Sequence, residues 1–174
     1  FKGDPISIGK LERFVADWSR ENGVVPAKPE TTNGIKVAVI GSGPSGLTCA
    51  GDLAKMGYDV TVFEADSRMG GKMEQVIPRS RLPQDILTKE LNRIEKMGVT
   101  FKTNTKVDAK LFAQIRENSD AVIVATGGHT ARVFPWPGNE LLVKGIDFLK
   151  AVNKGEKPAV GKKVIVIGCG NSGM

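Results

Sequence analysis

The sequence is poor in the side chains from which most catalytic and metal sites are built. Its 174 residues include two cysteines, one histidine and one tyrosine. The cysteines, Cys49 and Cys169, lie far apart and form no C-x-x-C pair. His129 has no acid or base spaced near it, so neither a hydrolytic triad nor a zinc site is predicted. We expect no metal site and expect each cysteine to be a small buried residue.

Long apolar runs are also missing. The longest, such as residues 164–167, are far too short to span a bilayer, and the N-terminus lacks the basic-then-apolar pattern of a secretion signal. We therefore expect no membrane insertion and a cytoplasmic location. The hydrophobic content of 40% is nevertheless enough for a proper core.

Acidic residues are fewer than basic residues. The sequence has 19 Asp and Glu and 25 Lys and Arg, which gives a net charge of +6. The basic residues are spread along the chain without interleaved aromatic residues. This pattern favours a solvated basic surface over a nucleic-acid interface. An acidic protein partner or an anionic cofactor would suit the charge equally well.

Glycine is abundant, and three glycines form the most informative motif. Residues 36–40 are a β-branched run typical of a buried parallel strand. Gly41, Gly43 and Gly46 follow in the pattern G-x-G-x-x-G. In this pattern the first glycine allows a tight turn, the second lets a phosphate approach the backbone, and the third lets the helix pack close to the strand. A dinucleotide pyrophosphate would lie at the positive end of the helix dipole.

The residues after the motif complete a strand–helix–strand unit. Helical spacing of apolar residues over 45–56 predicts a helix that ends at Gly57, and a second strand is predicted over 59–63. Glu64 ends this strand roughly 20 residues after the glycines, where an acidic side chain binds the adenosine ribose hydroxyls. This context disfavours the alternative of a ligand-free unit that happens to end in a surface glutamate.

Periodicity predicts the remaining elements. A helix over 6–18, capped by Ser7, would carry its apolar residues on one face, and it needs a partner in the sheet or in an upstream domain. Residues 21–34 are interpreted as a linker. The other predicted elements are a helix over 84–97 after Pro83, strand-like pieces over 99–103 and 105–107, a helix over 109–118 capped by Asp108, a strand over 121–125 and a helix over 146–153.

Residues 162–173 repeat the opening motif. A Val/Ile strand is predicted over 164–167, and Gly168, Gly170 and Gly173 again form G-x-G-x-x-G. Two dinucleotide motifs imply two nucleotide sites, which favours a flavin together with a nicotinamide. The expected fold is α/β, a Rossmann-like FAD/NAD(P)-binding fold with a central parallel β-sheet, truncated at the start of a second dinucleotide-binding domain. We expect a helix and linker over 1–34, an FAD-binding domain over 35–138, and a crossover with the start of an NAD(P)H-binding domain over 139–174.

With these motifs the sequence resembles the pyridine-nucleotide-dependent flavoproteins with two dinucleotide-binding domains, and most of all the glutamate synthase small (beta) subunit and its relatives. The resemblance covers essentially the entire chain. It rests on residues 41–46, Glu64 with Gly70-Gly71, Ile77-Pro78, Arg81-Leu82-Pro83, residues 125–127, residues 135–138 and residues 168–173.

The resemblance implies cofactors and the residues that hold them. The residues implied for FAD are Gly41, Ser42, Gly43, Pro44, Ser45, Gly46, Glu64, Ala65, Gly70, Gly71, Lys72, Val107, Ala125, Thr126 and Gly127. Those implied for NADPH or NADH are Gly168, Gly170, Asn171 and Ser172. In the family, hydride passes from the nicotinamide to the flavin, and electrons leave through iron–sulfur clusters or to a partner subunit. Because cofactors carry this chemistry, no catalytic residue is assigned.

Two further features of the resemblance concern what surrounds the flavin. Residues 4–8 resemble the tail of a cysteine-rich iron–sulfur domain, so iron–sulfur clusters would belong to an upstream domain. Residues 72–78, after the paired glycines, stand where the glutamate synthase small subunit usually carries apolar residues and a Tyr-Gly-Ile-Pro run. A redox or non-catalytic flavin-binding subunit of another multienzyme complex is therefore the alternative. A flavin disulfide reductase is disfavoured because the first domain has no cysteine pair.

Overall fold

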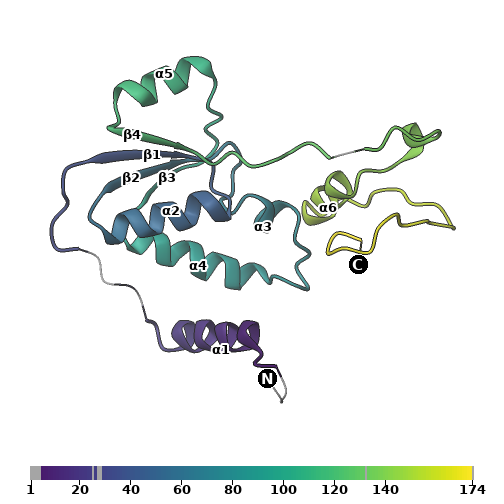
Figure 1. The fold of residues 1–174 in the computed structure, drawn as a ribbon, viewed down its shortest axis with the longest axis horizontal. Coiled ribbons are helices and arrows are strands. Elements are labelled where there is room, and N and C mark those ends of the chain that lie inside the picture. Colours follow the sequence, from purple (N-terminus) through teal and green to yellow (C-terminus); the bar gives the residue numbers. More distant parts are fainter. Residues whose placement is uncertain (1–4, 25, 27–28, 132, 174) are drawn as a thin grey trace.

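The computed structural model describes residues 5–24, 26, 29–131 and 133–173. Asp4, in the segment that resembles the tail of an iron–sulfur domain, and positions 25, 27 and 28 of the predicted linker lie outside the described residues. A central parallel sheet carries the fold (Figure 1). The strands are β1 (Lys36–Ile40), β2 (Asp59–Phe63), β3 (Thr100–Lys102) and β4 (Ala121–Val124), in the order β3-β2-β1-β4.

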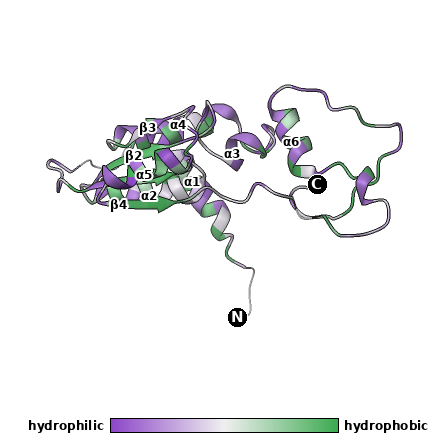
Figure 2. Ribbon diagram, turned by 90° about the horizontal axis from the view of Figure 1, so that it is seen from above, coloured by the Kyte–Doolittle hydropathy of each residue, from purple (hydrophilic) through white to green (hydrophobic). Residues whose placement is uncertain are grey.

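Alternation along the strands gives the sheet two buried faces. Val39 pairs in register with Val62, and both are fully buried on the face covered by α2 (Pro44–Lys55) and the end of α4 (Gln84–Lys96). Ala38 points to the other face, where Ile115 of α5 (Ala109–Glu117) packs. Figures 1 and 2 show this three-layer order and the concentration of hydrophobic residues in the strands. The predicted α/β fold with a parallel sheet is confirmed.

The predicted helix boundaries hold within a few residues. Asp108 caps α5 as expected, since its side chain accepts a hydrogen bond of 2.8 Å from Leu111 N. The crossover helix is α6 (Gly145–Asn153). Two short elements were not predicted, α3 (Lys72–Gln75) and the 3-10 helix η1 (Asn139–Leu141).

Two predicted strands are wrong. Residues 105–107 form no strand, because Asn104 has a left-handed backbone (φ 52°) and Thr105 N donates to Glu64 O at 2.7 Å, which takes the chain away from the β3 edge. Residues 164–167 also form no strand, and their side chains are 60 to 88% exposed. A strand needs a neighbouring ladder, and none is paired with this segment in the described part of the chain.

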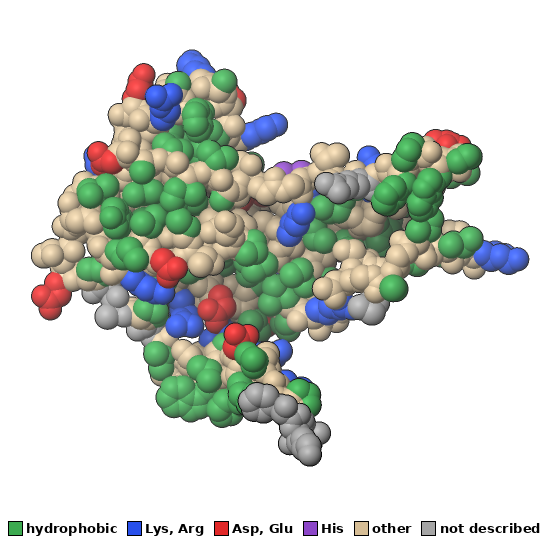
Figure 3. All heavy atoms as spheres, viewed as in Figure 1, with side chains coloured by type: hydrophobic (Ala, Val, Ile, Leu, Met, Phe, Trp, Pro, Cys, Tyr) green, Lys and Arg blue, Asp and Glu red, His purple; other side chains and the backbone are tan. Residues whose placement is uncertain are grey.

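The first helix, α1 (Ile8–Glu21), lies beside α4 and not on the sheet (Figure 1). Arg20 links the two helices through an ion pair with Glu90 of 2.9 Å. The apolar face predicted for α1 remains exposed and forms a hydrophobic patch on the lower helix in Figure 3; it consists of Ile8, Leu11, Phe14, Val15 and Trp18. Of the two partners expected for this face, the sheet does not cover it in the described residues, and an upstream domain stays a prediction.

Candidate functional site: two glycine turns and the carboxylate between them

The first glycine turn, residues 41–46, joins β1 to α2. Gly41 has φ +106°, and a Cβ there would overlap the carbonyl oxygen of Ala125. A Cβ on Gly46 would overlap the carbonyl oxygen of Gly41. These two glycines are therefore required by the packing of the turn itself, independently of any ligand.

Gly43 is different from both. Its backbone angles, φ −69° and ψ 177°, suit any residue, and a Cβ built on it would meet nothing within 4 Å. It is the N-cap of α2, so the first N–H groups of that helix open beside it. A glycine that the fold does not need, placed at a helix N-terminus, fits a backbone that a phosphate group must approach.

The carboxylate of Glu64 lies at the end of β2 next to this turn and is 7% exposed. Its Oε2 accepts hydrogen bonds from Ser42 N at 3.1 Å and from Ser42 Oγ at 2.5 Å. Its Oε1 accepts from Asp66 N at 2.9 Å. The predicted proximity of the acidic strand end to the glycine turn is thus present in the structure, with an additional role in holding the turn.

The paired glycines close over the first turn. Gly70 has φ +117° and Gly71 has φ +53°, and a Cβ on Gly71 would lie 2.8 Å from Gly43 Cα. Gly70 N donates to Ser42 O at 3.1 Å. The two glycines that the resemblance assigns to FAD therefore lie against the backbone of the first glycine turn.

The remaining residues implied for FAD fall into two groups. Ala125 to Gly127 follow β4, and Ala125 N donates to Ile40 O at 2.8 Å, which places this turn against Gly41. Val107 is half-buried in the cluster on the α5 face of the sheet. Pro44 and Ser45 begin α2, whereas Ala65, just after β2, and Lys72, the first residue of α3, are exposed.

The second glycine turn has the local geometry of the first. Gly168 has φ +105°, against +106° for Gly41. A Cβ on Gly173 would overlap Gly168 O and lie 3.5 Å from Val166 Cγ1, as a Cβ on Gly46 would overlap Gly41 O and lie 3.3 Å from Val39 Cγ1. Gly170, like Gly43, would place a Cβ in open space. The turn is therefore formed although the segment before it is not paired in a sheet.

A buried ionic cluster near the paired glycines was missed by the sequence reasoning. Glu74 of α3, 8% exposed, pairs with Arg79 at 2.8 Å and with Arg68 at 3.2 Å. Asn153 Nδ2 of α6 donates to Glu74 O at 3.2 Å, so the cluster joins α3 to the crossover helix. The signal was a carboxylate flanked by basic residues at 68 and 79, but sequence spacing alone did not show that they converge.

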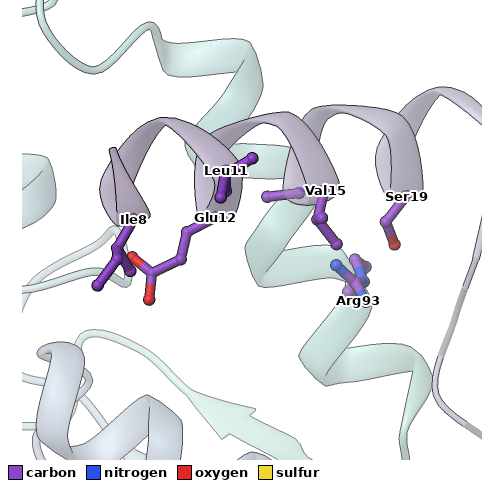
Figure 4. Close-up of a pocket in the computed structure, with 7 residues that line it drawn as sticks. Ile8, Leu11, Glu12, Val15, Ser19 and Arg93 are labelled. Carbon is purple, nitrogen blue, oxygen red and sulfur yellow. The ribbon is translucent and has the colours of Figure 1, made fainter. Parts of the chain in front are cut away.

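Two hollows on the surface of the described residues lie away from the glycine turns. A groove of about 540 Å³ lies between α1 and α4 and is lined mainly by apolar α1 residues with Arg93 (Figure 4). A polar cleft of about 360 Å³ lies between residues 66–75 and α6. The groove reflects loose packing of α1 against α4, and the polar cleft borders the Glu74 cluster.

Cysteine positions differ partly from expectation. Cys49 is half-buried in α2, but Cys169 is exposed in the second glycine turn, because that turn is not covered by a sheet. Among the described residues, no group of His, Cys, Asp and Glu is arranged to hold a metal ion. No helix in the described ranges is long and apolar enough to cross a bilayer.

Comparison with known proteins gives a consistent picture. A family model described as pyridine nucleotide-disulphide oxidoreductase matches residues 12–111 and 35–174. The chain is 37% identical to the NAD-dependent dihydropyrimidine dehydrogenase subunit PreT of Escherichia coli strain K12, over 98% of this chain and 42% of that protein. It is 34% identical to the glutamate synthase [NADPH] small chain of Mycobacterium tuberculosis, over 98% of this chain and 38% of that protein.

A solved structure agrees with these relatives. The 6-hydroxypseudooxynicotine amine oxidase of Pseudomonas geniculata N1 superposes with a TM-score of 0.57 at 27% identity, covering 76% of this chain and 21% of that chain. The chain thus spans less than half the length of these relatives. Since the family model matches most of the sequence and its glycine turns are formed, the chain belongs to the pyridine nucleotide-disulphide oxidoreductase family.

Proposed function

We propose that this chain is the FAD-binding part, with the start of the NAD(P)H-binding part, of a flavoprotein oxidoreductase. The observation that carries the proposal is Gly43. The fold does not require a glycine there, since its backbone angles are ordinary and its Cβ direction is open, yet it heads α2 between Glu64 and the paired glycines. A bound pyrophosphate is the physical reason for a glycine at such a position.

The residues present fit an FAD molecule. The first turn and the N-terminus of α2 would hold its pyrophosphate, and Glu64 would accept a hydrogen bond from the adenosine ribose. Gly70 and Gly71 would border the flavin half, with Val107 toward the adenine and the turn of Ala125 to Gly127 beside the dinucleotide. When bound, FAD supplies the capacity to accept hydride from a nicotinamide and to release electrons singly.

The second turn would hold NADPH or NADH through Gly168, Gly170, Asn171 and Ser172. Its likeness to the first turn, in the φ of the first glycine and the contacts of the last, supports this assignment. The chain's residues bind and align both cofactors, and no side chain is assigned a proton-transfer role. We retain the division into residues 1–34, 35–138 and 139–174 as part of this proposal.

The intact protein would pass electrons to an iron–sulfur group of an upstream domain or to a large partner subunit, as the resemblance to the glutamate synthase small subunit implies. We retain the cytoplasmic location as part of this proposal. The names of two relatives, a dehydrogenase subunit and a small chain, support a partner. A redox or non-catalytic flavin-binding subunit of another complex is the alternative function, favoured by the charged residues Lys72 and Glu74 at positions where the glutamate synthase small subunit is usually apolar.

The test is the visible spectrum of the full-length protein. A flavin band that bleaches on anaerobic addition of NADPH or NADH supports the oxidoreductase. A flavin band that neither nucleotide bleaches supports the non-catalytic alternative, and a colourless protein that cannot be reconstituted with FAD would reject both.

A further inference from the structure

A buried hydroxyl connects the three parts of the first site. Ser42 is fully buried, at 0% exposure. Its Oγ lies 2.5 Å from Glu64 Oε2 and 3.0 Å from Gly70 N. It therefore contacts the strand-end carboxylate and the paired-glycine turn from within the first glycine turn.

The direction of these two hydrogen bonds is fixed by chemistry. A backbone N–H only donates, so Ser42 Oγ accepts from Gly70. A carboxylate only accepts, so the single hydroxyl proton of Ser42 points to Glu64 Oε2. The result is a directed chain from Gly70 N–H through Ser42 Oγ–H to Glu64, in which each bond polarises the next.

These hydrogen bonds leave one oxygen of Glu64 with free acceptor capacity. Oε2 already receives two donors from Ser42, whereas Oε1 receives one, from Asp66 N. A carboxylate has about four acceptor positions in all, so the remaining capacity lies on Oε1. We propose that Ser42 is a positioning residue, whose hydroxyl holds Oε2 so that Oε1 receives the ribose hydroxyl of the bound dinucleotide.

This inference rests on the proposed function, and the structure offers a clean way to separate the hydroxyl from the fold. In Ser42→Ala, Gly70 N keeps its bond to the carbonyl oxygen of residue 42, at 3.1 Å, and Glu64 keeps the bond from the backbone N of residue 42. The turns therefore stay tied together, and the lost hydrogen bonds are the two made by the hydroxyl, one accepted from Gly70 N and one donated to Glu64 Oε2.

The experiment is calorimetric titration of the full-length protein, freed of flavin, with ADP and with 2′,3′-dideoxy-ADP. In the wild type, ADP should bind more tightly by about tenfold or more, the value of one hydrogen bond to a charged group. In Ser42→Ala, ADP affinity should fall by about tenfold while dideoxy-ADP affinity stays the same, so that the preference disappears.

The matched control is Thr88→Ala, which removes an exposed hydroxyl that donates to Gln84 O at 2.8 Å within helix α4. It should leave both affinities unchanged. Hydrogen exchange of the Gly70 amide gives a second readout, which should accelerate in Ser42→Ala and not in Thr88→Ala.

An equal loss of affinity for both ligands in Ser42→Ala would mean that the serine only supports packing, and the inference would be wrong. A wild type that binds neither nucleotide, or binds both equally, would instead reject the proposed dinucleotide site and this inference with it. If Ser42→Ala is too unstable to purify, Ser42→Cys replaces it, because a thiol is similar in size to the hydroxyl but is only a weak hydrogen-bond donor. Loss of the ribose preference in that variant, with unchanged dideoxy-ADP affinity, supports the carboxylate geometry, and retention of the preference contradicts it.

Discussion

A substitution at Gly43 should affect ligand binding without affecting folding. Gly43→Val should leave the protein folded, because the new side chain enters open space at ordinary backbone angles. It should abolish flavin binding, since the branched side chain fills the space that a pyrophosphate needs. Flavin absorbance after reconstitution measures the loss, and circular dichroism measures the fold.

Gly9→Val is a control for this variant. A Cβ on Gly9 in α1 also meets nothing within 4 Å, so the substitution adds the same side chain away from the turn. It should retain flavin binding. A normal yellow spectrum in Gly43→Val would mean that the first glycine turn is only a structural connection.

Glu64 combines a binding role with a structural one. Glu64→Ala should weaken FAD binding by about 1–3 kcal/mol, because the ribose loses a charged acceptor in a partly buried place. It should also lower the free energy of unfolding, since Ser42 N, Ser42 Oγ and Asp66 N lose their acceptor. Glu64→Gln keeps an acceptor oxygen and should cost less in both measurements.

Dialysis followed by flavin absorbance, together with urea unfolding, distinguishes the two effects. Unchanged FAD retention in Glu64→Ala would contradict the placement of the adenosine at the end of β2.

At the scale of elements, α4 packs in the hydrophobic core and α1 does not. Leu87→Ala should lower the free energy of unfolding by about 2–5 kcal/mol, because Leu87 is 3% exposed and its removal leaves a cavity under α2. Leu11→Ala, on the apolar face of α1 at 55% exposure, should change it by less than about 0.5 kcal/mol. Urea denaturation checks both, and similar effects in the two variants would show that α1 packs more firmly than described.

The elements that the sequence predicts well are those whose partners are close in the chain. The strand over 59–63 and the capped helix after Asp108 have local signals, namely β-branched alternation and a side-chain cap. Residues 164–167 have the same Val/Ile pattern but no adjacent ladder, so the pattern alone was not sufficient. Asn104 could not be foreseen, because its left-handed backbone is set by the bond of its N–H to Asp66 O.

The sequence predicts the glycines of the candidate site well and its hydrogen bonds less well. The spacing of Gly41, Gly43 and Gly46 is enough to predict the turn, and Glu64 follows from its distance along the chain. The bridging role of Ser42 was not predictable, because the motif leaves that position unspecified. The close approach of Gly71 to Gly43 was not predictable from the sequence either, because it joins two loops that only the tertiary fold brings together.

For the whole molecule, we expect the 174-residue chain alone to bind FAD weakly or not at all and to catalyse no NADPH-dependent reduction of a dye. The second glycine turn has no helix after it within the described residues, so the N–H groups that would receive a phosphate are not aligned. Flavin fluorescence during FAD titration, followed by anaerobic addition of NADPH, measures both steps. Tight stoichiometric binding followed by bleaching would show that this chain holds a complete active site.

The same chain should self-associate at high concentration. The exposed apolar residues of α1 and of segment 164–167 leave hydrophobic surface that a monomer rarely presents to water. Sedimentation velocity over a range of concentrations measures the association. Replacing Phe14 and Trp18 with serine should reduce it, and a concentration-independent monomer peak in the unaltered chain would contradict the expectation.

The formation of the second glycine turn without a paired strand has a consequence for folding. Its stereochemistry is specified by about six consecutive residues, so closing it requires no contact between distant parts of the chain. Such local contacts form early, whereas the ladder that joins β1 to β4 must bring together residues far apart in sequence. During synthesis, each glycine turn would therefore take shape before the sheet that later supports it.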